Sequence, residues 1–132
     1  MSEAYLEHAN LTVKNPDVTA SLLVQLFGWR VRWYGESIDN GYTVHVGGDH
    51  SYLALYAHPS EHNQAVDSYH HLHGLNHLGI VVNDLDATEE VIKAAGFQTR
   101  SHADYYPGRR FYFEDSDGLE FEVISYKELI DA

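Results

Sequence analysis

The sequence predicts an α+β fold in which two tandem βαβββ modules form a cupped mixed sheet. An internal repeat covers most of the chain, and each copy reads as a strand, a helix and three further strands. The length of 132 residues with 44% hydrophobic content suits one domain with a real core. We therefore expect a single domain over 1–132, with modules at 4–57 and 75–126, a connector at 58–74 and a C-terminal tail at 127–132.

The repeat is visible when LEHANLTVKNPDVTASLLVQLFGWRVR is compared with LNHLGIVVNDLDATEEVIKAAGFQTR. His8 aligns with His77 at an offset of 69 positions, and after one deletion Ala54 aligns with Glu122 at an offset of 68. The other matched pairs are Val13 with Val82, Asp17 with Asp86, Gly28 with Gly96, Arg32 with Arg100 and Asp49 with Asp117. The two halves therefore supply a position-by-position comparison within one chain.

Alternation of apolar and polar residues predicts a half-buried strand at the start of each copy, about residues 6–13 and 77–82. His8 and His77 both fall on the face opposite the apolar side chains. The later strands are expected at about 29–35, 42–47, 51–57, 97–102, 109–114 and 119–125, with the turns GGD and DSDG before the last strand of each copy.

A helix is expected after each first strand. Asn15 is a suitable N-cap for the first helix, and Asp86 with Glu89 could form a capping box for the second. Gly28 and Gly96 are expected to end the two helices. The core-facing positions should be Leu22, Leu23, Leu26, Phe27, Val91, Ile92 and Ala95.

Composition excludes several classes of partner. Twenty Asp and Glu against eight Lys and Arg give a formal charge of −12, which repels nucleic acid and anionic membranes. No apolar run approaches the roughly 20 residues that span a bilayer, and the N-terminal residues do not read as a signal peptide, so a cytoplasmic protein is expected. The chain has no cysteine, so a metal would have to be held by His, Asp or Glu.

Three of these residues form a candidate metal site. In a βαβββ unit the last strand lies beside the first, so Glu122 should meet His77, and a pseudo-twofold relation between the modules would bring His8 to the same point. Two imidazoles and one carboxylate leave about three positions open and suit one divalent ion, with Fe(II) favoured and Mn(II), Ni(II) or Zn(II) as alternatives. A single strand histidine more often has an ordinary polar partner, but the repeat of the position favours ligation. The group His70, His71 and His73 in the connector is interpreted as solvated surface.

The segments HLGIVVNDLDATEEVIKAAGF and FYFEDSDGLEFEVI resemble the second module of the vicinal oxygen chelate superfamily, which includes glyoxalase I, extradiol dioxygenases and fosfomycin-resistance proteins. By position, the resemblance implies that His8, His77 and Glu122 are the metal ligands. Where glyoxalase I has an acidic ligand on the last strand of its first module, this chain has Ala54. A three-ligand His-His-Glu set is what the resemblance implies for extradiol dioxygenases and fosfomycin-resistance enzymes.

His45 and Tyr52 are the candidate catalytic residues. If the GGD hairpin pairs His45 across from Tyr52, both share the face of Ala54, although an exposed hairpin histidine is the simpler interpretation. The expected substrate pocket is lined by Thr43, Ala54, Tyr56, Phe111 and Phe113. Core packing would explain those residues equally well.

The expected function is that of a metal-dependent enzyme on a small molecule that chelates through two oxygens, most simply a dioxygenase. A glyoxalase-like lyase or isomerase and a metal-free bleomycin-resistance-type binding protein remain alternatives. Fosfomycin-type transfer is less favoured because it needs a cluster of cations and the chain offers only Arg109 and Arg110 near the relevant loop. A homodimer is expected because open sheets have edge strands to cover; the metal site could lie within one chain or be shared between two.

Overall fold

The computed structural model describes residues 3–60, 65–106 and 108–126, and the predicted tail at 127–132 lies outside these ranges. The chain divides into two compact units, one up to residue 63 and one from residue 64 onward. Unit 1 contains β1 (His8–Thr12), α1 (Pro16–Phe27), β2 (Arg30–Glu36), the short 3-10 helix η1 (Ile38–Asn40), β3 (Tyr42–Gly47) and β4 (Tyr52–Ala57). Unit 2 contains β5 (Leu78–Val81), α2 (Leu85–Ala94), β6 (Arg100–Tyr105), β7 (Gly108–Glu114) and β8 (Glu120–Tyr126).

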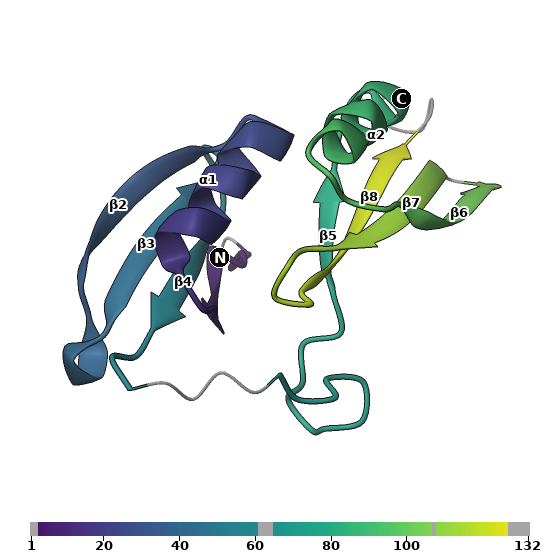
Figure 1. Ribbon diagram of the computed structural model, residues 1–132. Coiled ribbons are helices and arrows are strands. Elements are labelled where there is room, and N and C mark those ends of the chain that lie inside the picture. The colour runs from purple at the N-terminus through teal and green to yellow at the C-terminus, as the bar shows by residue number, and fades with distance from the viewer. Residues whose placement is uncertain (1–2, 61–64, 107, 127–132) are drawn as a thin grey trace. The chain divides into compact units, whose positions relative to one another are not determined.

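Each unit is one βαβββ module with its own mixed four-stranded sheet, as predicted (Figure 1). The strand orders are β1-β4-β3-β2 and β5-β8-β7-β6, so the last strand of each module lies beside its first. That pair is parallel and the other pairs are antiparallel. The shared topology places the start of β1 or β5 next to the start of β4 or β8.

Strand register confirms the alignment of the two halves. Asn10 pairs with Ala54 in unit 1, and Gly79 pairs with Glu122 in unit 2. Because Asn10 and Gly79 are both two residues after the repeated histidine, Ala54 occupies the position in unit 1 that Glu122 occupies in unit 2.

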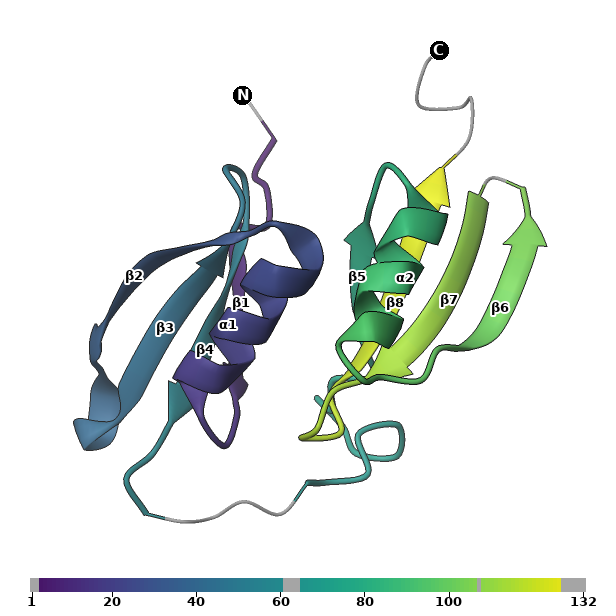
Figure 2. The same ribbon diagram turned by 45° about the horizontal axis from the view of Figure 1, so that its top comes forward.

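One helix covers one face of each sheet (Figure 2). In unit 1, Leu23 and Leu26 of α1 are buried on the same side as Val44, Val46 and Leu55. In unit 2 the buried side chains of that face include Ile92, Phe111, Phe113, Phe121 and Val123. The other face of each sheet, here called the open face, carries the polar side chains of alternate residues.

The first helix starts as predicted. The Asn15 side chain accepts hydrogen bonds from the backbone N–H groups of Asp17 and Val18, which are otherwise unsatisfied at a helix start. Gly28 ends α1 with φ +70, a left-handed conformation that glycine adopts without a steric penalty. Of the helix positions expected in the core, Val91 is wrong, because 41% of its surface is exposed.

The predicted capping box of the second helix is also wrong. Asp84 is the N-cap, and its Oδ1 accepts from the backbone N–H of Ala87 at 3.0 Å. Asp86 instead lies in the first turn of α2 and pairs with Arg109 at 2.9 Å. Both aspartates lie close to the start of the helix, and either could serve as an N-cap by residue type. The sequence pattern therefore did not distinguish them.

This assignment predicts unequal effects of two aspartate substitutions. Asp84→Ala should lower the free energy of unfolding by about 1 kcal/mol, the usual effect of losing an N-cap side chain. Asp86→Ala should lower it less, because an exposed ion pair is screened by solvent. Urea denaturation of the two variants measures the difference, and a larger loss for Asp86→Ala would contradict the assignment.

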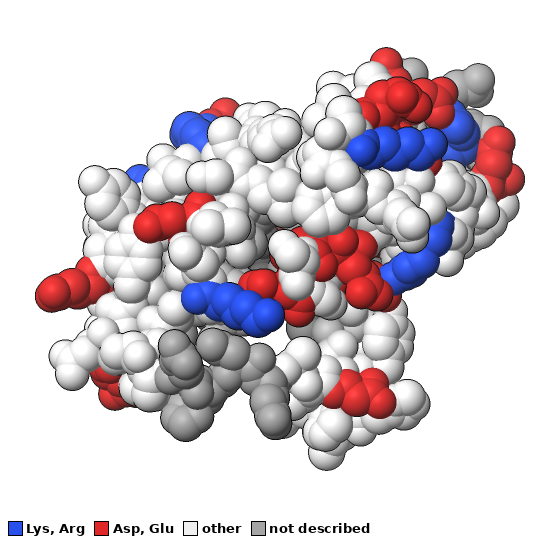
Figure 3. Space-filling model, in the orientation of Figure 1, with Lys and Arg blue, Asp and Glu red and all other residues white. Residues whose placement is uncertain are grey.

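Charged side chains lie on both units. Acidic groups are spread over both in the face drawn, and several have a basic group beside them (Figure 3). None of the helices in the described ranges is long and apolar enough to cross a membrane.

Candidate functional site

The open face of unit 2 brings two of the three predicted ligands together. His77 immediately precedes β5, and Glu122 lies on the adjacent β8. The Nε2 atom of His77 is 3.1 Å from Oε1 of Glu122. The His77 side chain is 31% exposed, and the Glu122 side chain is 14% exposed. The imidazole is therefore partly accessible to solvent, and the carboxylate is largely enclosed by protein. The parallel pairing of β5 with β8 therefore produces the predicted contact.

The Glu122 carboxylate is held in place by its other oxygen. Arg110 on β7 donates from Nη1 to Oε2 at 2.9 Å. Tyr112 pairs with Glu122 across the two strands, and its ring lies edge-on to the His77 ring at 5.6 Å. Burial raises the pKa of the Tyr112 phenol, and the neighbouring Glu122 charge raises it further, so this hydroxyl stays protonated at neutral pH. One carboxylate oxygen is thus oriented by the protein and the other faces His77.

A second glutamate lies on the other side of His77. Glu120 Oε2 is 3.6 Å from the Nδ1 atom of His77, a buried nitrogen for which the described residues provide no hydrogen-bond partner. Tyr69 donates to the same oxygen at 2.5 Å, and Arg100 donates to Oε1 at 3.1 Å. Burial acts to raise the pKa of Glu120, but the hydrogen bonds from Tyr69 and Arg100 outweigh it and lower that pKa. An ionised Glu120 beside Nδ1 would hold the His77 ring with Nε2 toward Glu122.

The open face of unit 1 lacks the two carboxylates of unit 2 and carries a stack of rings. His8 pairs with Tyr52 across β1 and β4, and the two rings stack at 4.8 Å with an interplanar angle of 11°. Tyr52 stands where unit 2 has Glu120, as Ala54 stands where it has Glu122. The matched arginines therefore have different partners. Arg100 forms an ion pair with Glu120, whereas the guanidinium of Arg32 lies 4.5 Å from the centre of the Tyr52 ring. Tyr52 and Glu120 are therefore aromatic in unit 1 and charged in unit 2, whereas Glu122 is matched by the small Ala54.

The predicted strand pairing of His45 with Tyr52 is wrong by two residues. His45 pairs with Ala54, and Tyr52 pairs with Gly47, because the turn between β3 and β4 is longer than assumed. The two rings still stack at 4.6 Å, since cross-strand diagonal neighbours on one face lie within reach. His45 and Tyr52 therefore share the open face with Ala54, as expected.

Trp33 on β2 extends this row of rings, with its centroid 5.0 Å from that of His45. Nothing in its own strand marks Trp33 as the partner of His45, so the sequence pattern did not single it out. Burial lowers the pKa of His45, and the nearby His8 and Arg32 lower it further, so the imidazole is neutral at neutral pH.

Two of the predicted pocket residues lie on the wrong face. Phe111 and Phe113 are fully buried on the helix-covered side of β7, opposite to Tyr112 and Glu122, and Phe113 stacks on Phe121 at 5.0 Å. They are core residues of unit 2, not lining of a substrate pocket.

The other three pocket candidates lie on the open face of unit 1. Thr43 pairs with Tyr56 beside the pair of His45 and Ala54. Thr43 and Ala54 are only 4% and 2% exposed in this structure, and the Tyr56 hydroxyl donates to the carbonyl of Ile38. They share the face with His45, but little of their surface is accessible.

Several other histidines have local partners of their own. In the connector His70 contacts Asp67 at 2.7 Å and His71 contacts the Asp67 carbonyl at 2.6 Å. His102 on β6 contacts Glu89 of α2 at 2.6 Å. Among the residues that the structure describes, no three His, Asp or Glu side chains gather into a ligand set. The described ligand candidates that lie together are thus His77 and Glu122.

The donor chemistry of that pair fits a divalent metal ion. An imidazole nitrogen and a carboxylate oxygen are ligands for Fe(II), Mn(II), Ni(II) and Zn(II). The second oxygen of the carboxylate accepts a hydrogen bond from Arg110, as is typical of a metal ligand, and the second nitrogen of the imidazole lies 3.6 Å from Glu120.

The fold and this pair define a two-module βαβββ protein with a polar open face. Residues 5–123 match the family described as the "Glyoxalase/Bleomycin resistance protein/Dioxygenase superfamily". The chain belongs to this superfamily, as its resemblance to vicinal oxygen chelate proteins implied. No match was found among curated proteins.

Solved structures share the fold. A glyoxylase/bleomycin resistance protein/dioxygenase domain from Frankia sp. EAN1pec is 22% identical, with a TM-score of 0.81 over 96% of this chain and 95% of that one. The fosfomycin resistance protein FosX from Listeria monocytogenes, complexed with Mn(II) and sulfate, is 19% identical, with a TM-score of 0.69 over 96% and 95% of the two chains. At these identities the likeness concerns the fold alone.

Proposed function

We propose that this protein is a divalent-metal-dependent enzyme acting on a small molecule that binds through two neighbouring oxygens. His8, His77 and Glu122 are the proposed ligands, and Fe(II) is the favoured ion. The observation that carries the proposal is the 3.1 Å approach of His77 Nε2 to a Glu122 carboxylate whose other oxygen is fixed by Arg110. When bound, the ion would supply Lewis acidity and, as iron, redox chemistry.

The third ligand is assigned through the repeat. His8 stands in unit 1 where His77 stands in unit 2, on the open face and 36% exposed. The structural relative FosX was crystallised with Mn(II), which is in keeping with a divalent ion on this fold. The proposal adds His8 to the pair that the structure describes.

The protein groups around the ligands have positioning roles in this proposal. Arg110 orients the Glu122 carboxylate, and Glu120 fixes the ring orientation of His77 from the opposite side. Tyr69 and Arg100 in turn hold Glu120. Such support keeps a ligand in one rotamer and raises its affinity for metal.

Ala54 favours oxygenase-like chemistry over isomerisation. A proton shift beside a carbonyl needs a base close to the metal, and the position equivalent to Glu122 in unit 1 has no acid–base group. The imidazole of His45 lies across from Ala54 and stacks on Tyr52. We propose that His45 and Tyr52 bind a phenolic substrate and exchange its hydroxyl proton.

The substrate class can be tested by turnover. Protein prepared without a His-tag and loaded anaerobically with Fe(II) should convert catechols in the presence of dioxygen to yellow ring-cleavage products. Loss of the product after His45→Ala, with iron content unchanged, would support the role of His45. Turnover of a hemithioacetal without catechol cleavage would instead establish glyoxalase-like activity and overturn the oxygenase proposal.

Fosfomycin-type transfer receives no support from the arginines. Arg109 forms an ion pair with Asp86, and Arg110 forms one with Glu122. Both candidate cations therefore already have carboxylate partners.

A homodimer remains part of the proposal. Each described sheet has two edge strands, β1 and β2 in unit 1 and β5 and β6 in unit 2. Edge strands expose unpaired backbone groups, and pairing with a second copy is one way to cover them.

A further inference from the structure

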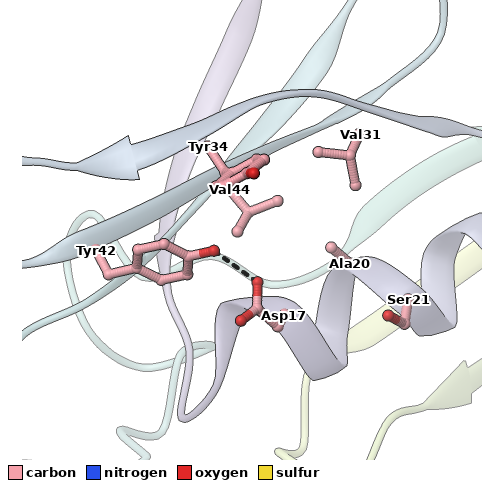
Figure 4. Close-up of a pocket in the computed structure, with 7 residues that line it drawn as sticks. All are labelled: Asp17, Ala20, Ser21, Val31, Tyr34, Tyr42 and Val44. Atoms are coloured by element: carbon pink, nitrogen blue, oxygen red, sulfur yellow. Dashed lines mark hydrogen bonds between the residues drawn. The ribbon is translucent and has the colours of Figure 1, made fainter.

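A groove lies on the helix-covered side of unit 1, away from the open face. It runs between α1 and β2 over the floor of β3, with a volume of about 500 Å³ (Figure 4). Val31 on β2 supplies accessible apolar surface and is 45% exposed, whereas Ala20 on α1 and Val44 on β3 form its floor and are each only 1% exposed. Tyr34 lies at its edge and is 66% exposed. The volume is within the range of roughly 300–1,000 Å³ that is usual for small-molecule sites.

Unit 2 shows what closes the equivalent place. Glu89 on α2 occupies the position of Ala20 in the repeat. Its carboxylate contacts His102 on β6 at 2.6 Å and Thr99 at 2.5 Å, and so links the helix to the edge of the sheet. Alanine cannot make this link, so in unit 1 the helix and β2 are not joined there.

The floor of the groove differs in the same direction. Strand register places Val44 where unit 2 has Phe111, a fully buried side chain. Unit 2 keeps only a smaller hollow of about 240 Å³, lined by polar groups that include Glu89, His102 and Arg109. The larger apolar groove is therefore a specific feature of unit 1 and does not follow from the βαβββ fold.

The polar end of the groove is negative. The Tyr42 hydroxyl donates to Oδ1 of Asp17 at 2.7 Å, which fixes the carboxylate at the mouth (Figure 4). This hydrogen bond is the main reason that the pKa of Tyr42 is raised, so the phenol remains a donor. Among the described lining residues there is no Lys, Arg or His. An anion would meet Asp17 without a compensating charge.

We propose that the α1–β2 groove binds a small organic cation, an amine attached to a flat apolar group. The ammonium would pair with the Asp17 carboxylate, and the apolar group would lie against Val31 and the ring of Tyr34, above the buried Val44. This site is separate from the open face and does not depend on the proposed metal chemistry.

Tryptamine and two matched compounds test the proposal. In ¹⁵N–¹H correlation spectra, tryptamine should cause saturable shifts confined to α1, β2 and β3 of unit 1. Tryptophol, which replaces the amine by a neutral hydroxyl, and indole-3-acetate, which replaces it by an anion, should bind at least about tenfold more weakly, the size expected for a hydrogen bond to a charged group.

Two variants assign the binding to the groove. Asp17→Asn should weaken tryptamine binding by about tenfold. Glu36→Gln removes an exposed charge from β2 outside the groove lining and should leave the affinity unchanged. Thermal unfolding of both variants checks that the fold is retained.

Three results would overturn the proposal. The first is the absence of saturable shifts, and the second is equal binding of tryptamine and tryptophol. The third is a change of the same resonances on dilution of the protein alone, with a matching change in sedimentation, which would show that a second copy covers the groove.

Discussion

Glu122→Gln is expected to abolish stoichiometric metal binding. Protein prepared without a His-tag should bind about one equivalent of Mn(II) or Fe(II), and the variant should lose most of it. Glutamine has nearly the same shape and can still accept a hydrogen bond from Arg110, but it lacks the negative charge that a divalent ion requires from this oxygen donor. Elemental analysis after dialysis, together with Mn(II) titration followed by electron paramagnetic resonance, measures the loss.

The neighbouring glutamate provides the control. Glu120→Gln removes the same charge from the same face of β8, two residues away. Because Glu120 lies 3.6 Å from Nδ1 of His77 and is proposed only to orient that ring, this variant should keep the stoichiometry and weaken the affinity by about 10–100-fold. Equal metal retention by Glu122→Gln and the unmodified protein would eliminate the proposed site. Complete loss in both variants would show that Glu120 is itself a ligand.

Phe121→Ala is expected to have the largest effect on stability. Phe121 has no exposed surface, stacks on Phe113 at 5.0 Å, and lies on β8 between the two glutamates but on the opposite face. Truncation of a fully buried phenylalanine lowers the free energy of unfolding by about 3–5 kcal/mol. Urea denaturation followed by circular dichroism measures it.

Tyr106→Ala is the matched control for this substitution. Tyr106 is 77% exposed, and its replacement should change the free energy of unfolding by less than about 0.5 kcal/mol. A loss below about 1 kcal/mol for Phe121→Ala would show that the side chain is not part of a close-packed core.

Much of the fold was predictable because the chain repeats itself. A single helix or strand pattern is ambiguous, but the same order of patterns in two copies left the βαβββ module as the consistent solution. The register of His77 and Glu122 followed from the topology alone, since the last strand must lie beside the first. The equivalence of Ala54 and Glu122 was predicted from the alignment and is confirmed by strand pairing.

The errors arose where a face or a register had to be chosen locally. Alternation shows that Phe111 and Phe113 share a face, but only the pairing of Tyr112 with Glu122 shows that this face is the one covered by α2. The length of the turn after Gly47 decided the partner of His45.

The connector contributed a residue that no periodic pattern could identify. Tyr69 reaches Glu120 from 51 positions away in sequence. Contacts of this kind depend on the path of an irregular segment, which carries no repeat of strand or helix spacing. The position of Glu120 beside His77 was missed as well, and Tyr69 and Arg100 are the residues that hold this carboxylate there.

At one matched position of the repeat, unit 1 has Tyr52 and unit 2 has Glu120, so the open faces of the two modules differ in chemistry. One half of the repeat holds the acidic residues of its open face in a network of arginine and tyrosine contacts, and the other half has replaced that network by a row of rings. Under the proposed function, changes to the rings of Tyr52, His45 or Trp33 should therefore alter which molecules are accepted, whereas changes to His8, the proposed ligand of unit 1, should weaken metal binding. Selectivity could then be redesigned in one module without rebuilding the acidic network of the other.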